Sequence, residues 1–146
     1  MANSTSASLK LTVQATGENS GTWGQITNTN LLILEQAIGG YDALNVTNAS
    51  RALTFTNGAL SNGKNEVIKL TGTLEGNLNV TIPDSVEKTY IVEDGTDHAG
   101  YTLTFKTTSG TGVLLCEGHS YTLYSDGTNV VKAGELRKWR AISSAE

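Results

Sequence analysis

The feature that most constrains the fold is a long series of short segments with alternating apolar and polar residues, which fills the chain from residue 41 to residue 132. Alternation with a period of two is typical of a strand with one buried face. It is regular in Tyr101-Thr-Leu-Thr-Phe105 and in Tyr121-Thr-Leu-Tyr124. The strands expected from this pattern are 43–47, 52–56, 66–71, 78–82, 89–92, 101–107, 113–116, 121–124 and 130–132.

Turn signals separate these segments. Dipeptides that tolerate positive φ and favour tight hairpins occur at Asn57-Gly58, Asn62-Gly63, Asp94-Gly95 and Asp126-Gly127. Pro83 follows an apolar run and is expected to end a strand. The pattern predicts a mainly β chain, folded as an antiparallel β-sandwich or a barrel-like domain. No fixed-length repeat is visible, so a solenoid is not expected.

The N-terminal region has a different pattern. Residues 8–14 alternate and predict a strand, and residues 17–24 form a glycine-rich loop around Trp23. A short helix is expected next, because apolar residues recur at helical spacing and form a wide stripe. Its N-cap is expected at Asn28 or Asn30, and Gly39 and Gly40 can adopt the left-handed conformation that ends a helix. The residues that define the stripe are Leu31, Leu34 and Ile38, with Leu32 and Ile33 widening it.

Length and pattern together predict how the chain is organised. A chain of 146 residues is long enough for one complete core and too short for two ordinary domains. The expected division is an assembly segment over 1–40, a β domain over 41–133 and a basic tail over 134–146. In the tail, Leu136 and Trp139 lie three positions apart, so one helical turn is expected there. The tail either docks on a neighbouring subunit or packs Trp139 on its own domain.

Composition excludes several classes of function. The formal net charge of −4 and a pI of about 5.1 leave no electrostatic footprint for nucleic acid. No apolar run reaches the roughly 20 residues of a membrane-spanning helix, and no signal peptide is recognisable. The single cysteine, Cys116, excludes an intrachain disulfide framework and a zinc site built from several cysteines.

Few residues could take part in catalysis or metal binding. His98 lies in a Gly/Asp-rich loop and is expected to be solvated. Cys116 and His119 are three positions apart, but two ligands do not make a metal site, so Cys116 is expected to be a small buried hydrophobe. Glu93, Asp94 and Asp97 lack the spacing of an EF-hand loop, so a solvated acidic turn is favoured over calcium binding. The sequence therefore predicts no catalytic residue, cofactor or metal site.

One segment resembles a known family. The motif Gly17-Glu-Asn-Ser-Gly-Thr-Trp-Gly24, then Asn28-Thr-Asn30 and Leu34-Glu-Gln-Ala-Ile-Gly39, is similar to a module found in bacteriophage tail-fibre and other virion structural proteins, especially of marine and cyanobacterial phages. Weaker similarity continues in order to about Val131. The resemblance implies a non-catalytic building block, often a homotrimer, on the exterior of the virion.

The resemblance also gives the glycines and Trp23 expected roles. Gly21 and Gly24 let the backbone turn on either side of Trp23, whose indole is expected to pin the loop under the helix or to join the core of its own chain. The apolar stripe of the helix is expected to be buried between subunits. The residues predicted at assembly interfaces are Trp23, Leu31, Leu34, Ile38, Leu136 and Trp139.

Three functions follow as expectations. The first is a small capsid decoration protein that contacts the major capsid protein, with a tail-fibre or tail-tip component bound to tail proteins as the alternative. The second is a module that binds host-surface glycans, for which Tyr41, Tyr101, Tyr121, Tyr124 and Trp139 would offer stacking faces. The third, an enzyme such as a glycan depolymerase, is disfavoured because no acids can be seen to converge.

Overall fold

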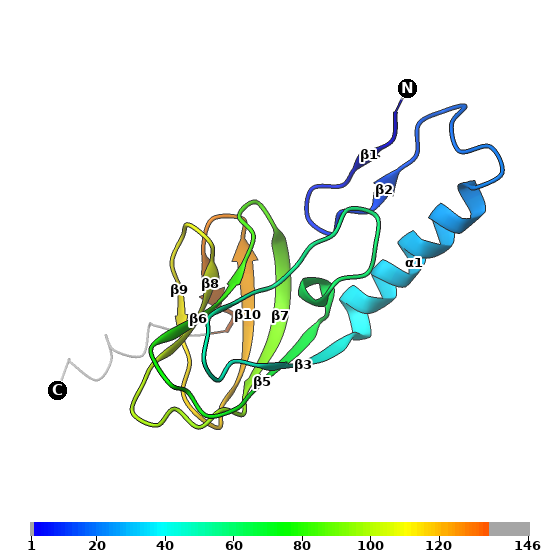
Figure 1. Ribbon diagram of the computed structural model, residues 1–146. Helices are drawn as coiled ribbons and strands as arrows, with labels where there is room; N and C mark the ends of the chain where they lie inside the picture. Colours follow the sequence, from blue (N-terminus) through cyan, green and yellow to red (C-terminus); the bar gives the residue numbers. More distant parts are fainter. Residues whose placement is uncertain (1, 135–146) are drawn as a thin grey trace.

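The computed structural model describes residues 2–134 and confirms a mainly β chain with one α-helix in that part (Figure 1). A small pair of strands, β1 (Ser4–Thr5) and β2 (Thr12–Val13), precedes the helix α1 (Trp23–Gly39). The remaining elements are β3 (Tyr41–Asn45), β4 (Arg51–Ala52), the 3-10 helix η1 (Asn62–Lys64), β5 (Val67–Thr71), β6 (Leu78–Ile82), β7 (Glu87–Asp94), β8 (Leu103–Thr107), β9 (Gly112–Leu114), β10 (Ser120–Asp126) and β11 (Val130–Lys132).

Two sheets pack face to face and share one core, and α1 projects from their side (Figure 1). One has five strands in the order β11-β10-β7-β5-β3, and the other has four in the order β4-β6-β8-β9. From β3 to β8 the chain alternates between the sheets, and each new strand lies parallel to the previous strand of its sheet. This is the connectivity of a short β-solenoid, in which each coil contributes one strand to each sheet. The antiparallel strands β9, β10 and β11 end the stack.

The parallel pairing differs from the antiparallel pairing expected for the sandwich, and the expectation that no solenoid forms was wrong. Side chains alternate with a period of two in both kinds of strand, so the pattern does not distinguish them. The coils also differ in length, which hides the repeat. Positions aligned across coils are Tyr41, Val67 and Ile91 in one sheet and Arg51, Val80 and Phe105 in the other.

The turn dipeptides explain part of this difference. Only Asp126-Gly127 closes a hairpin, between β10 and β11, with Gly127 at a φ of 90°. The Gly95 amide instead donates to the carbonyl of Leu70 and extends the parallel pairing beyond β7. Gly63 lies in η1, where a Cβ would clash with the ring of Phe55. These glycines are required by close backbone approach rather than by a hairpin turn.

The core lies between the two sheets. The five-stranded sheet contributes Ile68, Leu70, Tyr90, Val92 and Leu123, and the four-stranded sheet contributes Val80, Ile82, Leu103 and Phe105, all fully buried. The rings of Tyr90 and Phe105 meet edge to face with their centroids 5.5 Å apart. Burial raises the pKa of Tyr90 far above its usual range, and its hydroxyl donates to the carbonyl of Gly63. The facing sides of the sheets therefore fill the interior without help from α1.

The helix is longer than expected and its ends differ from the prediction. It begins at Trp23, so the N-cap is Thr22 and neither Asn28 nor Asn30. Its C-cap, Gly40, has a φ of −72° and is extended rather than left-handed. Glycine is needed there because a Cβ would clash with the Asn65 side chain and the Gln36 carbonyl. The predicted boundary at residue 40 lies between α1 and β3, and Leu136 and Trp139 lie outside the described residues.

We expect the core to be sensitive to truncation and the sheet surface to tolerate it. Leu103→Ala should lower the free energy of unfolding by about 2–5 kcal/mol, because Leu103 is fully buried and its removal leaves a cavity. Leu114→Ala, on the neighbouring strand β9 but exposed, should change it by less than about 0.5 kcal/mol. Denaturant unfolding measures both values, and equal losses would contradict the assigned core.

We expect the hairpin turn between β10 and β11 to make the free energy of unfolding depend on pH. The amides of Asn129 and Thr128 donate to the Asp126 carboxylate and hold its pKa below 3.8. This contribution is present above pH 3.8 and is lost as the pH falls through the lowered folded-state pKa. We expect Asp126→Asn to lose less stability than the wild type between pH 5 and about pH 2. Denaturant titrations at several pH values measure this, and an equal loss of unfolding free energy in the two proteins would contradict the prediction.

Candidate assembly site

The glycine-rich loop before α1 is shaped by Asn19. Gly17, Gly21 and Asn19 all have positive φ, which glycine and asparagine tolerate best. The Asn19 carbonyl accepts the amides of Thr22 and Trp23, each at 2.9 Å, and so starts the first turn of the helix. Its side-chain amide exchanges hydrogen bonds with that of Asn3 at 2.8 and 3.0 Å. Asn19 therefore holds the loop and the N-terminal strands together.

A second asparagine attaches the N-terminal strands to the helix. The Asn30 side chain accepts the Thr12 amide at 2.9 Å and donates to the Thr12 carbonyl at 2.8 Å, as a neighbouring strand would. One turn earlier, Gln14 donates to the hydroxyl of Thr27 at 3.0 Å. Asparagine and threonine are weak helix formers. These tertiary bonds explain why α1 begins at Trp23 and not at the predicted N-cap, Asn28 or Asn30.

The C-terminal end of α1 is joined to the β domain. Ile33 is the buried residue of the helix. The Gln36 side chain donates to the Ser61 carbonyl at 3.0 Å and accepts the Ser61 amide at 3.4 Å. The Gly40 amide donates to the Gln36 carbonyl at 2.8 Å. The helix is therefore fixed at its base, and most of its length projects away from the sheets (Figure 1).

The face of α1 turned away from these attachments is apolar and exposed. The predicted interface residues Leu31, Leu34 and Ile38 have exposed fractions of 58%, 38% and 79%, and Leu32 is also exposed. Trp23 is 64% exposed, so its indole neither pins the loop under the helix nor joins the core. In this chain the loop is held by Asn19 instead. The structure thus places these four predicted residues on the surface of one helix.

Two grooves border this face. One, of about 420 Å³, runs along the helix and is lined by Asn28, Leu31, Leu32 and Glu35. The other, of about 460 Å³, lies where the helix meets the β domain and is lined mainly by Leu32, Glu35, Gln36, Tyr41, Leu60 and Asn65. Tyr41 and Leu60 are exposed. The apolar surface therefore continues from the helix onto the first strand of the β domain.

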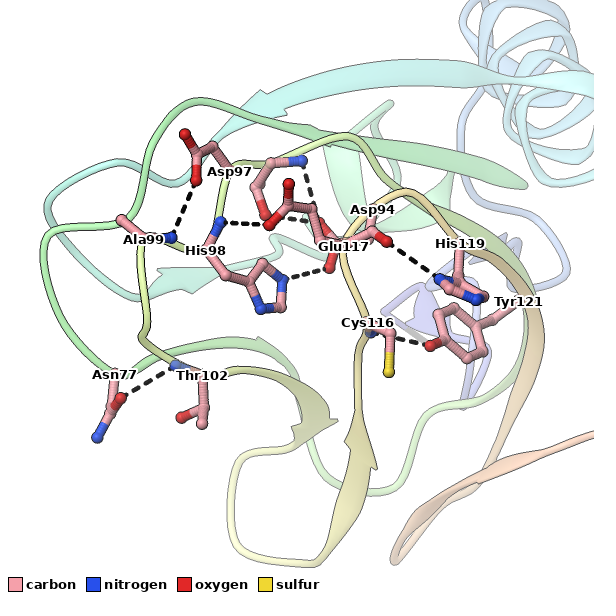
Figure 2. Close-up of polar contacts among 11 residues, drawn as sticks. Asn77, Asp94, Asp97, His98, Ala99, Thr102, Cys116, Glu117, His119 and Tyr121 are labelled. Carbon is pink, nitrogen blue, oxygen red and sulfur yellow. Dashed lines mark hydrogen bonds and ion pairs between the residues drawn. The ribbon is translucent and has the colours of Figure 1, made fainter.

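A polar cluster at the end of β7 is the other candidate (Figure 2). Asp94 is fully buried. Its Oδ1 accepts the Thr96 amide and hydroxyl at 3.1 and 2.6 Å, and its Oδ2 lies 2.7 Å from His98 Nε2. The His98 amide donates to Glu117 at 3.1 Å. The expectation of a solvated acidic turn with a solvated histidine was wrong for Asp94 and His98, because these bonds offset their loss of water.

The remaining polar residues near this cluster do not converge. Cys116 is exposed, so the expected burial of this cysteine was wrong. Its amide donates to the Tyr121 hydroxyl at 2.9 Å, and burial raises the pKa of Tyr121. His119 Nδ1 lies 3.0 Å from the Glu117 carbonyl. Glu93 pairs with Lys69 at 3.0 Å. Among residues 2–134, no three His, Cys, Asp or Glu side chains are placed to hold a metal ion.

One buried charge was missed by the sequence analysis. Lys64 is fully buried, and its ammonium donates to the carbonyls of Thr56 and Ala59, both at 2.6 Å. Burial lowers the pKa of Lys64, and the nearby Lys10 lowers it further. The ammonium closes the loop that carries Leu60 and so shapes the groove beside α1. No local pattern marks this lysine, because its partners are backbone groups.

Comparisons of the chain with protein-family models, with curated proteins and with solved structures found no match. Within the described part of the chain, no helix combines the length and the apolar character needed to cross a membrane.

We expect Asn30 to control attachment of the N-terminal strands. Asn30→Ala removes both bonds to Thr12 and should speed hydrogen exchange of the Thr12 amide about five- to a hundredfold, since a part-buried backbone group loses its partner. The matched control is Asn28→Ala, two positions away on the same helix and exposed. Equal exchange in both variants would show that the strands are held by other contacts.

Proposed function

We propose that this protein is a non-catalytic structural subunit that works by assembling with copies of itself. The observation that carries the proposal is the exposed apolar face of α1 on a helix that projects from an already filled core. Burying one Leu or Ile side chain contributes about 1.5–3 kcal/mol. Exposed apolar patches of this kind mark interaction surfaces. Self-association, with a trimer as the proposed state, removes this surface from water.

We further propose that the assembly is a small decoration protein on the exterior of a phage particle, bound to the major capsid protein. The support is the resemblance of residues 17–39 to virion modules, together with the structural roles of the motif residues. Gly17, Asn19 and Gly21 shape the loop, and Asn30 holds β2 against the helix. The motif thus builds the projecting helix rather than a catalytic centre. This explains why glycine and asparagine, rather than acids or nucleophiles, define it.

A tail-fibre or tail-tip subunit that binds host-surface glycans is the second candidate. It is favoured by the exposure of Tyr41, Tyr101 and Tyr124, since exposed aromatic rings can stack on sugars. Tyr121 is excluded as a stacking face, because its side chain is partly buried and packs against the hydrophobic core. Glycan-array binding that is lost in Tyr41→Ala, Tyr101→Ala or Tyr124→Ala would favour this candidate over capsid decoration.

The proposal assigns no catalytic role to Asp94 and His98. The Asp94 carboxylate is fully buried, and both of its oxygens are occupied by Thr96 and His98. Its backbone also links two segments, because its amide donates to His119 and its carbonyl accepts from Gly118. These bonds are those of a corner that joins β7 to the segment before β10. We therefore propose that the pair stabilises this corner.

Two measurements test the proposed function. Sedimentation of the full chain should give an oligomer, and Ile38→Asp should shift it towards monomer because a charge cannot be buried unpaired. Leu114→Asp, exposed on β9 and far from α1 in the chain, is the matched control and should leave the oligomer intact. Quantitative mass spectrometry of purified particles should find many copies per particle for capsid decoration and few for a tail subunit. Absence from particles would refute the virion role.

A further inference from the structure

We infer that Asn57 is a site of spontaneous deamidation, and that contact with the loop between β1 and β2 controls how fast it reacts. This covalent modification is independent of the proposed assembly. The chain contains two asparagine–glycine pairs, Asn57-Gly58 and Asn62-Gly63. They share the same chemistry, but the fold holds them in different ways, and this difference singles out Asn57.

The reaction needs only the asparagine, the following amide and water. The backbone nitrogen of Gly58 attacks Cγ of Asn57, loses its proton to solvent and expels Nδ2 as ammonia. Water then opens the succinimide ring at one of its two carbonyl carbons and leaves either aspartate or isoaspartate at position 57. Asparagine is a thermally labile residue. A following glycine favours ring closure, because it has no side chain to hinder the attacking nitrogen.

The Asn57 side chain is free to react, although its neighbours are fixed. It is exposed and has no hydrogen-bond partner within the described part of the chain. On either side of it, the buried ammonium of Lys64 holds the carbonyls of Thr56 and Ala59, both at 2.6 Å. The carboxamide of Asn57 therefore lies at the tip of a loop that is anchored at its base.

The Gly58 amide is the group that the fold protects. It donates to the carbonyl of Lys10 at 2.7 Å, and while this bond lasts the nitrogen keeps its proton and cannot close the ring. Lys10 has a φ of 57°, in the left-handed region that non-glycine residues seldom adopt. A Cβ on Gly58 would clash with the hydroxyl of Thr12, so the turn packs closely against β2. Opening of this contact frees the nucleophile.

The second pair is protected on both of its reacting groups. The Oδ1 of Asn62 accepts the amide and the hydroxyl of Thr54 at 2.7 and 2.9 Å. The Gly63 amide donates to the Thr54 carbonyl at 3.0 Å, and Gly63 is buried against the ring of Phe55. Ring closure at Asn62 has to break three hydrogen bonds, whereas ring closure at Asn57 has to break one. Asn57 is therefore the pair that reacts in the folded chain.

The isoaspartate product does not fit the contacts of the original loop. It adds a methylene group to the main chain between positions 57 and 58, while Thr56 is bonded to Lys64 and Gly58 to Lys10. A hydrogen bond to an ammonium is about twice as strong as one between neutral groups. The bond between Gly58 and Lys10 is therefore the one that breaks. Deamidation loosens the contact that holds the loop between β1 and β2.

Paired substitutions at Lys10 test whether this contact controls the reaction. Proline cannot adopt a φ of 57°, so Lys10→Pro displaces the carbonyl. Lys10→Gly is the matched control, because glycine accepts this φ and the same charge is removed. We expect isoaspartate at position 57 to form about three- to tenfold faster in Lys10→Pro than in Lys10→Gly, since one hydrogen bond is lost. Peptide mapping by mass spectrometry, on the full chain incubated at mildly alkaline pH, measures both rates.

The second pair is an internal control for unfolding. In the wild type, Asn57 should deamidate at least about tenfold faster than Asn62, because a local opening is more frequent than a larger one. Equal rates at position 57 in the two Lys10 variants would overturn the inference. Rates that rise equally at both asparagines in Lys10→Pro would show reaction from an unfolded chain and would also overturn it. After deamidation the Thr12 amide should exchange faster, and unchanged exchange would refute the loosening.

Discussion

The structure depends on the packing of two sheet faces against each other. Successive coils stack Ile68, Leu70 and Val92 on one side and Val80, Leu103 and Phe105 on the other, and these side chains fill the interior. Close packing leaves no room for further apolar groups. The helix that precedes the first coil therefore has no interior to enter. Its apolar face stays outside because the core is complete without it.

Outside the core, polar side chains attach the helix α1 to the neighbouring segments. Asn19, Asn30 and Gln36 each bond to backbone or amide groups of a neighbouring segment. Each such bond contributes only about 1 kcal/mol, but together they determine the direction of the helix and the side that the N-terminal strands cover. The opposite side of the helix, with Leu31 and Ile38, stays exposed. A fixed helix also loses less conformational entropy on binding than a mobile one.

The buried charges show how much of this organisation is non-local. Asp94 is partnered by Thr96 and His98, close in the chain, yet its burial depends on Gly118 and His119 from a later segment. Lys64 is partnered by carbonyls of Thr56 and Ala59, and its own side chain is enclosed by the fold. A sequence pattern reports neither, because charged residues in polar loops are usually solvated. Cys116 is a further example: its residue type predicts burial, and the structure places it on the surface.

The features that could be predicted from the sequence are local ones. Alternation located the strands from residue 41 onward, with β6 and β11 at their observed bounds, and helical spacing located the exposed residues Leu31, Leu34 and Ile38. Contacts between distant segments determine the rest: the parallel coils in place of hairpins, the start of the helix at Trp23, and the burial of Asp94. The reason is that side-chain periodicity depends on a residue's own backbone, whereas pairing and burial depend on segments distant in the chain.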